Sequence, residues 1–219
     1  KLVDSLKIDN DSSDETRVNK IEIKKDIPDF TKLINVKHPD IQVFSKEYEA
    51  YAYAQFGIYI WRNEKEYFSI RCGPIGQNGV GGHSHYDQLS IECFTNNQWI
   101  ARDPGTGTYT DDIQKRNNFR SMQYHWGPNI DLKFRKEDEF DCFKLNNISN
   151  GEVLLFDNKN FIGVADFNGK KIYRKLTINN GIITVEDFSV LKNLERYKTW
   201  GEMRKGIKEE FSEGYKRFS

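Results

Sequence analysis

Two of the four histidines in this 219-residue chain stand one residue apart, within the stretch GVGGHSHYDQLSIECF. His83 and His85 follow a glycine-rich run and precede an alternating apolar segment, which places them at the mouth of a predicted strand. Side chains two residues apart in an extended backbone face the same side, so the two imidazoles could lie side by side. An imidazole can ligate a metal or exchange a proton near neutral pH, so the pair is a candidate for either chemistry.

Two further residues of suitable type follow His85 within 40 residues. Asp103 stands 18 residues after His85, before a Pro-Gly turn, and a hairpin return would bring its carboxylate level with the histidines. His125 lies in the segment RNNFRSMQYHWGPN. Two histidines and a carboxylate with an open position suit zinc, and also other borderline metals. The alternative is that each histidine only caps a turn or bonds a buried carbonyl, but clustering of three in one strand-turn-strand unit favours a functional site.

The elements that must position these residues are predicted to be mostly short β-strands. From Gly57 onward, alternating apolar segments are separated by turn-forming residues at roughly ten-residue spacing. Asn-Gly pairs at 168–169 and 180–181 predict hairpins. Only 111–122 and 200–211 have a helical period. The pattern predicts an all-β chain, a large antiparallel β-sandwich with few short helices.

Composition narrows the function classes. The chain has 33 basic and 33 acidic residues, so no net charge attracts nucleic acid or an anionic membrane. No apolar run approaches the about 20 residues that cross a bilayer, and the polar opening KLVDSLKIDNDSSDETR lacks the apolar stretch of a signal peptide. We expect residues 1–48 to be a polar, partly ordered lead-in and residues 49–219 to form the sandwich domain.

The cysteines and tryptophans are predicted to serve the core. Cys72 and Cys93 share strand parity with apolar neighbours, which indicates small core residues rather than a disulfide framework. With Cys142 the count is odd and no Cys-x-x-Cys pair exists, so a thiolate zinc site is not expected. Trp61 and Trp99 lie on predicted strands and are expected in the core rather than on a sugar-binding surface.

Three ordered motifs, GGHSHYDQLSIE, ARDPGTGTYT and RNNFRSMQYH, resemble the signature of the heparinase II/III-like family of polysaccharide lyases. The resemblance spans about residues 56–130 and implies that the strands belong to the C-terminal β-sandwich of such a lyase. It further implies a substrate that is an acidic, uronate-containing polysaccharide, such as a glycosaminoglycan, cleaved by β-elimination. It also implies an upstream (α/α) toroid domain in the parent protein, which would supply an acid-base tyrosine, so this chain alone would be catalytically incomplete.

The matching positions divide into a catalytic residue, a metal set and a substrate-binding set. The resemblance implies that His83 lies at the sugar-binding cleft and takes part in the elimination. It implies that one zinc ion, with water as a further ligand, is bound by His85, Asp103 and His125. It implies substrate contacts from Tyr109, Arg116 and Arg120. One departure is Trp126, where family members commonly have asparagine.

Several of these roles have plainer alternatives. Arg116 and Arg120 are four residues apart on a predicted helical turn, and each could pair with an aspartate at 111–112 instead of a uronate. Asp87 either orients His85 by accepting a hydrogen bond from the ring nitrogen that does not bind the metal, or caps a turn.

Two function classes therefore remain. The first is the β-sandwich of a polysaccharide lyase. The second is a noncatalytic β-sandwich that binds glycan or supports another domain, with zinc as a staple. The resemblance implies a periplasmic or cell-envelope location, although cysteines buried in a core are equally compatible with a reducing cytosol.

Overall fold

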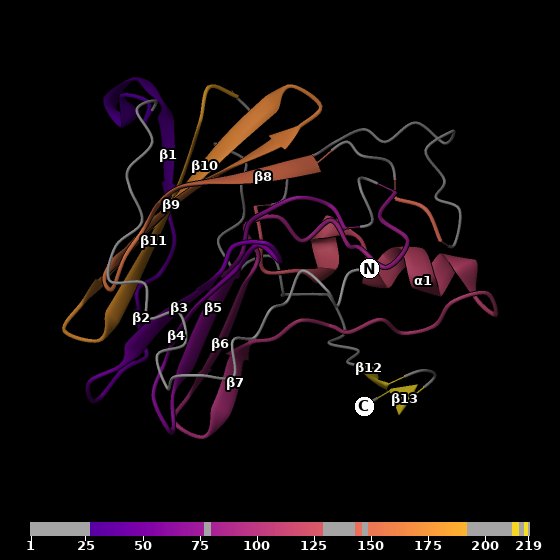
Figure 1. The fold of residues 1–219 in the computed structure, drawn as a ribbon, viewed down its shortest axis with the longest axis horizontal. Coiled ribbons are helices and arrows are strands. Elements are labelled where there is room, and N and C mark those ends of the chain that lie inside the picture. The colour runs from indigo at the N-terminus through magenta and orange to yellow at the C-terminus, as the bar shows by residue number, and fades with distance from the viewer. Residues whose placement is uncertain are drawn as a thin grey trace, which may run out of the picture.

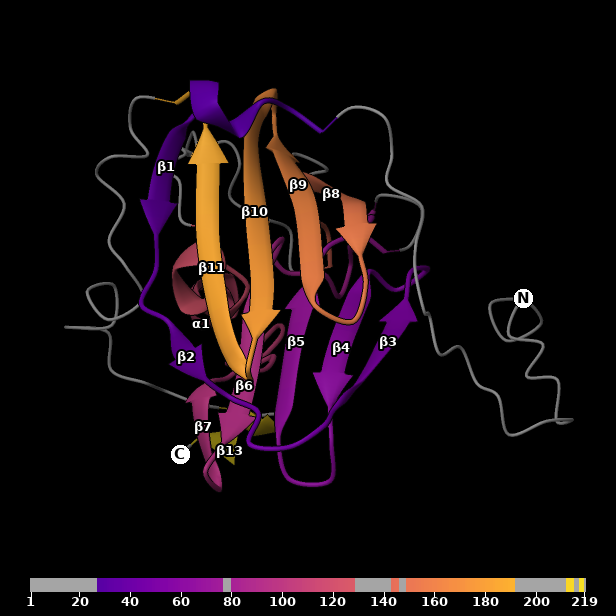
Figure 2. The same cartoon turned by 90° about the vertical axis from the view of Figure 1, so that its left-hand side faces the viewer.

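The computed structural model describes residues 27–76, 80–128, 143–145, 149–191, 212–214 and 217–218. Within these ranges the chain is mostly β, and its two large antiparallel sheets pack face to face (Figures 1 and 2). This confirms the predicted antiparallel β-sandwich. A separate short hairpin is formed by β12 (Ser212–Gly214) and β13 (Arg217–Phe218).

The five-stranded sheet leads directly into the histidine-bearing loop. Its strand order follows the chain: β3 (Glu49–Tyr53), β4 (Ile58–Arg62), β5 (Tyr67–Arg71), β6 (Ile91–Thr95) and β7 (Gln98–Ala101). Between β6 and β7, Asn96 and Asn97 have φ of 51° and 59°, the backbone that a tight type I′ hairpin turn requires. The hairpin returns the chain, so the residues after β7 lie beside those before β6.

The six-stranded sheet contains the longest strands. They are β1 (Ile34–Lys37), β2 (Ile41–Gln42), β8 (Ser149–Phe156), β9 (Asn160–Phe167), β10 (Lys170–Asn179) and β11 (Ile182–Ser189). Their order is β1-β11-β10-β9-β8, and β2 also pairs with β11. Both predicted Asn-Gly hairpins are confirmed, since 168–169 joins β9 to β10 and 180–181 joins β10 to β11, with positive φ throughout.

The described part of the predicted lead-in contributes to this sheet. Strands β1 and β2 pair with β11, and Ile34, Val36 and Ile41 pack against the core. Farther along, the Thr95 hydroxyl donates to the Val43 carbonyl at 2.9 Å, which links this segment to β6. The strands were not expected because pieces of four and two residues are too short to show a clear alternation of apolar and polar side chains.

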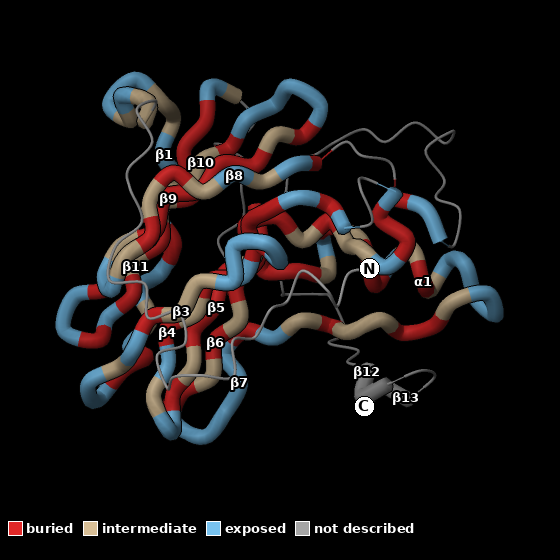
Figure 3. The backbone as a smooth tube through the Cα atoms, in the orientation of Figure 1, coloured by how far each residue is buried: buried red, intermediate tan, exposed pale blue. Residues whose placement is uncertain are grey.

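Aromatic side chains join the two sheets. The Trp61 ring lies 4.9 Å from that of Phe156, and the Tyr59 ring lies 5.1 Å from the same side chain. Trp61 is fully buried and its indole N–H donates to the Asp157 carbonyl, as its place in the core requires. Figure 3 shows buried positions along both facing surfaces. Burying one such ring contributes about 1.5–3 kcal/mol.

Of the other residues predicted to lie in the core, some are buried and one is not. Cys72 and Cys93 are buried free thiols, as expected, whereas Cys142 lies outside the described residues. Trp99, in contrast, is 43% exposed on the edge strand β7, where its ring contacts Tyr67 and Phe94 on the outer face. The expectation that Trp99 belongs to the core is therefore wrong.

Helices are few in the described ranges. The predicted helical segment near 111–122 contains α1 (Ile113–Phe119) and a 3-10 turn, η4 (Met122–Tyr124), and a further turn, η2 (Phe30–Lys32), precedes β1. Asp112 caps α1 by accepting from the Lys115 amide at 2.8 Å. The predicted helical segment 200–211 lies outside the described residues. Of the helices described, none is long and apolar enough to cross a membrane.

Candidate functional site

Residues 80–90 form the last part of the connection from β5 to β6, and they carry both paired histidines. Gly81 starts it at φ +66°, where an added Cβ would lie 2.7 Å from Ile75 Cγ2, so the tight bend requires glycine. Because the loop turns instead of extending, its histidines separate. His83 is exposed and contacts Tyr109, whereas His85 contacts His125. The two imidazoles therefore have different partners, and the side-by-side arrangement that an extended backbone would allow is not needed to explain either contact.

His85, Asp103 and His125 come together as predicted. One potential ligand atom from each lies within 4.8 Å of the others. His125 Nδ1 is 3.0 Å from Asp103 Oδ2, and the two imidazole rings are 5.1 Å apart. The three residues come from separate segments: the β5–β6 loop, the turn after β7 and the residue that ends η4. We call these three residues the His-Asp-His cluster.

The Asp103 carboxylate is oriented by its own turn. Its Oδ1 accepts from the Gly105 amide at 2.8 Å, which leaves Oδ2 facing His125. The Asp103 amide in turn donates to Glu92 on β6 at 3.2 Å, so the turn is tied to the neighbouring strand. The sequence Asp-Pro-Gly therefore presents one carboxylate oxygen to the cluster.

Burial and neighbouring charge set the protonation states of the cluster. Burial lowers the pKa of His85 to about 3, and the charge of His125 acts in the same direction, so His85 is neutral. Burial raises the pKa of Asp103, but the hydrogen bond and charge of His125 outweigh it and hold the net pKa well below its usual value. Burial lowers the pKa of His125, yet Asp103 outweighs it and the net pKa is raised. A neutral imidazole and a carboxylate are the states that metal binding needs, and His125 would release its proton.

The cluster has unfilled hydrogen-bonding capacity that a metal would meet. His125 Nδ1 lies 3.0 Å from Asp103 Oδ2, whereas His125 Nε2 is buried and has no hydrogen-bond partner within the described part of the chain. Buried polar atoms usually have partners, so this arrangement suits a bound cation. His85 Nε2 lies 3.2 Å from Arg116 Nη1 and must accept from it, since guanidinium only donates. A metal at Nε2 would compete with Arg116 for that lone pair.

Two aromatic rings lie beside the exposed histidine. His83 Nδ1 lies 3.2 Å from the Tyr109 hydroxyl, and the His83 ring is 6.4 Å from that of Phe143. Phe143 stacks on Tyr109 at 5.7 Å with 17° between the ring planes. We call His83, Tyr109 and Phe143 the aromatic cluster. Sequence reasoning missed Phe143, which is 49% exposed and has no recognisable motif around it.

The two predicted arginines lie beneath these clusters. Both are fully buried. The Arg116 guanidinium contacts His85 and lies 4.8 Å from the centre of the Tyr109 ring, so it bridges the His-Asp-His and aromatic clusters. Arg120 donates to the Asn117 amide oxygen and the Lys144 carbonyl. Their predicted role in substrate binding stays a prediction, and their burial favours support of the side chains above.

Asp87 lies beside the same loop. Its carboxylate is 3.9 Å from Arg71 Nε, and burial raises its pKa. Its predicted role as the partner that orients His85 stays a prediction.

Comparison with known proteins bears on the predicted resemblance. Residues 46–126 match the family model described as Heparinase II/III-like, C-terminal, which confirms the family predicted from the motifs. No curated protein matches the chain.

Three solved structures are similar to part of the chain. A heparinase III with methylated lysines gives a TM-score of 0.49 at 16% identity over 65% of this chain, and another heparinase III gives 0.48 at 18% over 64%. The heparan sulfate lyase HepC from Pedobacter heparinus gives 0.36 at 17% over 59%. In each case the match spans 22% of the length of the solved chain.

Proposed function

We infer that this chain, whose residues 46–126 belong to the heparinase II/III-like C-terminal family, is the β-sandwich part of a polysaccharide lyase. The substrate we propose is an acidic, uronate-containing glycan, cleaved by β-elimination. The observation that carries this function is an exposed imidazole, His83, in contact with the Tyr109 hydroxyl and backed by the His-Asp-His cluster.

The chemistry of elimination explains these residue types. A lyase removes the proton next to the uronate carboxylate and expels the sugar linked at position 4. This requires stabilisation of the charge that develops on the carboxylate side, together with a base and an acid within reach. His83 can neutralise that charge or exchange a proton near neutral pH. Tyr109, 3.2 Å from the His83 ring, orients the imidazole and can contact the substrate.

The aromatic cluster supports a sugar-binding role for this surface. Phe143 offers an exposed ring close to His83, and apolar ring faces stack on the C–H faces of sugars. Arg116 lies under Tyr109 and places positive charge near an expected uronate. In this proposal the buried Arg116 and Arg120 contribute to substrate binding indirectly, because they hold in place the side chains that contact the substrate.

We assign the His-Asp-His cluster to one zinc ion with water as a further ligand. Nitrogen and oxygen donors without thiolate suit zinc, and His125 Nε2 has no hydrogen-bond partner in the described residues. When bound, zinc would supply a crosslink between three loops. His85, Asp103 and His125 would thereby hold the His83-bearing loop in place.

Replacing His85 by alanine is expected to remove stoichiometric zinc from the purified chain, because two protein ligands do not hold zinc against dilution. Elemental analysis after zinc supplementation measures this. His83→Ala is the matched control, since His83 is exposed and lies outside the cluster, and it should keep the wild-type zinc content. A wild-type chain without stoichiometric metal would overturn the zinc assignment.

The lyase proposal is tested in the full-length protein that carries this chain, because we expect an upstream helical toroid to supply the acid-base tyrosine. Incubation with uronate polymers should produce the ultraviolet absorbance of an unsaturated product. The isolated 219-residue chain should produce none above background. A folded full-length protein that yields no product from any acidic glycan would favour the noncatalytic sandwich instead.

A further inference from the structure

A group of charged side chains lies buried in the six-stranded sheet. Arg174 on β10 and Asp187 on β11 are cross-strand partners, and Arg174 Nε and Nη2 each donate to one oxygen of Asp187 at 2.7 Å. His38, just after β1, lies 2.8 Å from Asp187 Oδ2 through its Nε2. All three are at most 2% exposed. We call them the Arg-Asp-His group.

The remaining arm of Arg174 reaches the two loops that carry the cluster histidines. Its Nη1 donates to the Leu89 carbonyl at 2.5 Å and to the Trp126 carbonyl at 3.0 Å. Leu89 comes four residues after His85 in the same loop, and Trp126 directly follows His125. One guanidinium therefore contacts both loops at once.

The loops also contact each other where Arg174 meets them. The Trp126 amide donates to the Ser90 hydroxyl at 3.0 Å. Leu89 has φ of 61°, a conformation that costs a bulky residue free energy and persists only where surrounding contacts impose it. Its amide donates to the Arg71 backbone carbonyl at the end of β5 and its carbonyl accepts from Arg174, so Leu89 is held from both sides.

We propose that Arg174 is a positioning residue that sets the spacing of His85 and His125, and that Asp187 and His38 hold Arg174 in turn. That this spacing affects metal binding rests on the zinc site proposed above. Only a guanidinium has enough donors in a fixed planar arrangement for this role. Its Nε and Nη2 bind the carboxylate of Asp187, while Nη1 binds two backbone carbonyls. A long, regularly paired strand such as β10 is a rigid base from which to hold two loops.

Stability alone does not account for this arrangement. A buried ion pair is often no more stabilising than apolar side chains of the same volume. What an apolar replacement cannot do is bind the carbonyls of Leu89 and Trp126. The geometry therefore points to placement of the loops as the role of the group.

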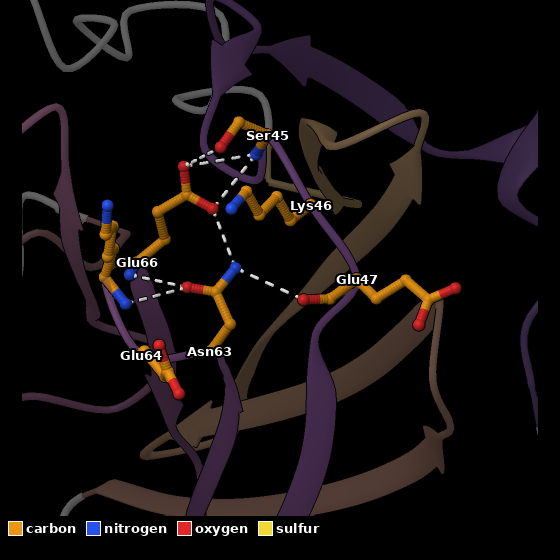
Figure 4. A pocket seen from close by; sticks show the side chains of 7 residues that line it. Ser45, Lys46, Glu47, Asn63, Glu64 and Glu66 are labelled. Atoms are coloured by element: carbon orange, nitrogen blue, oxygen red, sulfur yellow. Dashed lines mark hydrogen bonds between the residues drawn. The ribbon is translucent and has the colours of Figure 1, made fainter.

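The test compares Arg174→Lys with a matched change remote from the loops. Lysine keeps the positive charge opposite Asp187 but loses the fork. The control is Glu66→Gln, at the other end of β5, where Glu66 accepts from the Ser45 amide at 3.0 Å and from Asn63 Nδ2 at 2.8 Å. Figure 4 shows these bonds lining a surface pocket of about 400 Å³. Both changes disturb a largely buried polar network, but only the first touches the loops.

Three measurements on the 219-residue chain separate the outcomes. Amide hydrogen exchange in the metal-free chain should become faster at 85–90 and 124–127 in Arg174→Lys, and stay unchanged there in Glu66→Gln. Zinc affinity, measured by competition with a chelator, should fall about 10- to 100-fold in Arg174→Lys alone. The visible absorption spectrum of bound Co²⁺ should change in the same variant, which reports altered ligand geometry.

The exchange measurement needs no metal and keeps the two proposals distinguishable. A wild-type chain that binds no zinc would end the zinc assignment, and the exchange comparison would still decide the role of Arg174. If Arg174→Lys does not fold, Asp187→Asn, which loosens the fork but keeps its shape, should speed exchange in both loops by a smaller factor. Wild-type exchange in both loops of a folded variant overturns the inference.

Discussion

Replacing His83 by alanine is expected to lower kcat of the full-length protein by about 100- to 10,000-fold, the range for losing a residue that transfers or neutralises a proton in the transition state. His83 is exposed and its partner in the described structure is the Tyr109 hydroxyl, so its loss should leave the core intact. Initial rates of unsaturated product formation on the best uronate polymer measure the effect. Because the interaction is needed mainly in the transition state, KM should change much less than kcat.

Two controls make the His83 result specific. Zinc content and the unfolding midpoint of His83→Ala should match the wild type, which separates lost chemistry from a lost site. Tyr109→Phe keeps the ring that stacks on Phe143 and removes only the hydroxyl next to His83, so it should lower kcat by a smaller factor. A His83→Ala protein with wild-type kcat would show that another group carries the proton, and the proposed catalytic role would be wrong.

Replacing Asp187 by alanine is expected to lower the free energy of unfolding by about 3–5 kcal/mol, because it leaves Arg174 buried and charged without its carboxylate. Both side chains are fully buried and joined by two hydrogen bonds of 2.7 Å. Urea denaturation followed by tryptophan fluorescence measures the change, with the midpoint lowered and the slope unchanged. The double change to leucine at both positions should recover only part of the loss, because it removes the unpaired charge but leaves the Leu89 and Trp126 carbonyls without the Arg174 donor.

The same pair predicts how stability depends on pH. Burial raises the pKa of Asp187, but Arg174 and then His38 outweigh it, so the net pKa in the folded protein lies below the ordinary value. The contribution of this carboxylate to stability is therefore fully present above its unfolded pKa of about 3.9 and is lost as the pH falls through the lower folded value. Asp187→Ala should lack this part of the acid dependence. An equal acid dependence in both proteins would contradict the assignment.

Local patterns in the sequence determined the class of fold. Alternation over four to eight residues specifies which face of a strand is buried, and Asn-Gly pairs supply the positive φ that tight hairpins need. Both are properties of neighbouring residues, which is why the hairpins at 168–169 and 180–181 were predicted correctly. The approach of Asp103 to His85 was also predictable, because a single short hairpin brings the turn after β7 back to the loop before β6.

The tertiary structure alone decided those features that depend on contacts between residues far apart in the sequence. The resemblance implied separate roles for His83 and His85, but the contact of His83 with the Tyr109 hydroxyl depends on the bend at Gly81, which is set by close packing against distant residues. Alternation along its strand puts Arg174 on the apolar face with Ile172 and Leu176, but it does not show which groups pair with a charge buried there. Its partners Leu89 and Trp126 lie 85 and 48 residues away, and they meet it only because the two sheets and their loops pack together. Burial then makes each of its hydrogen bonds necessary, because an unpaired guanidinium in the core would cost more than the fold can supply.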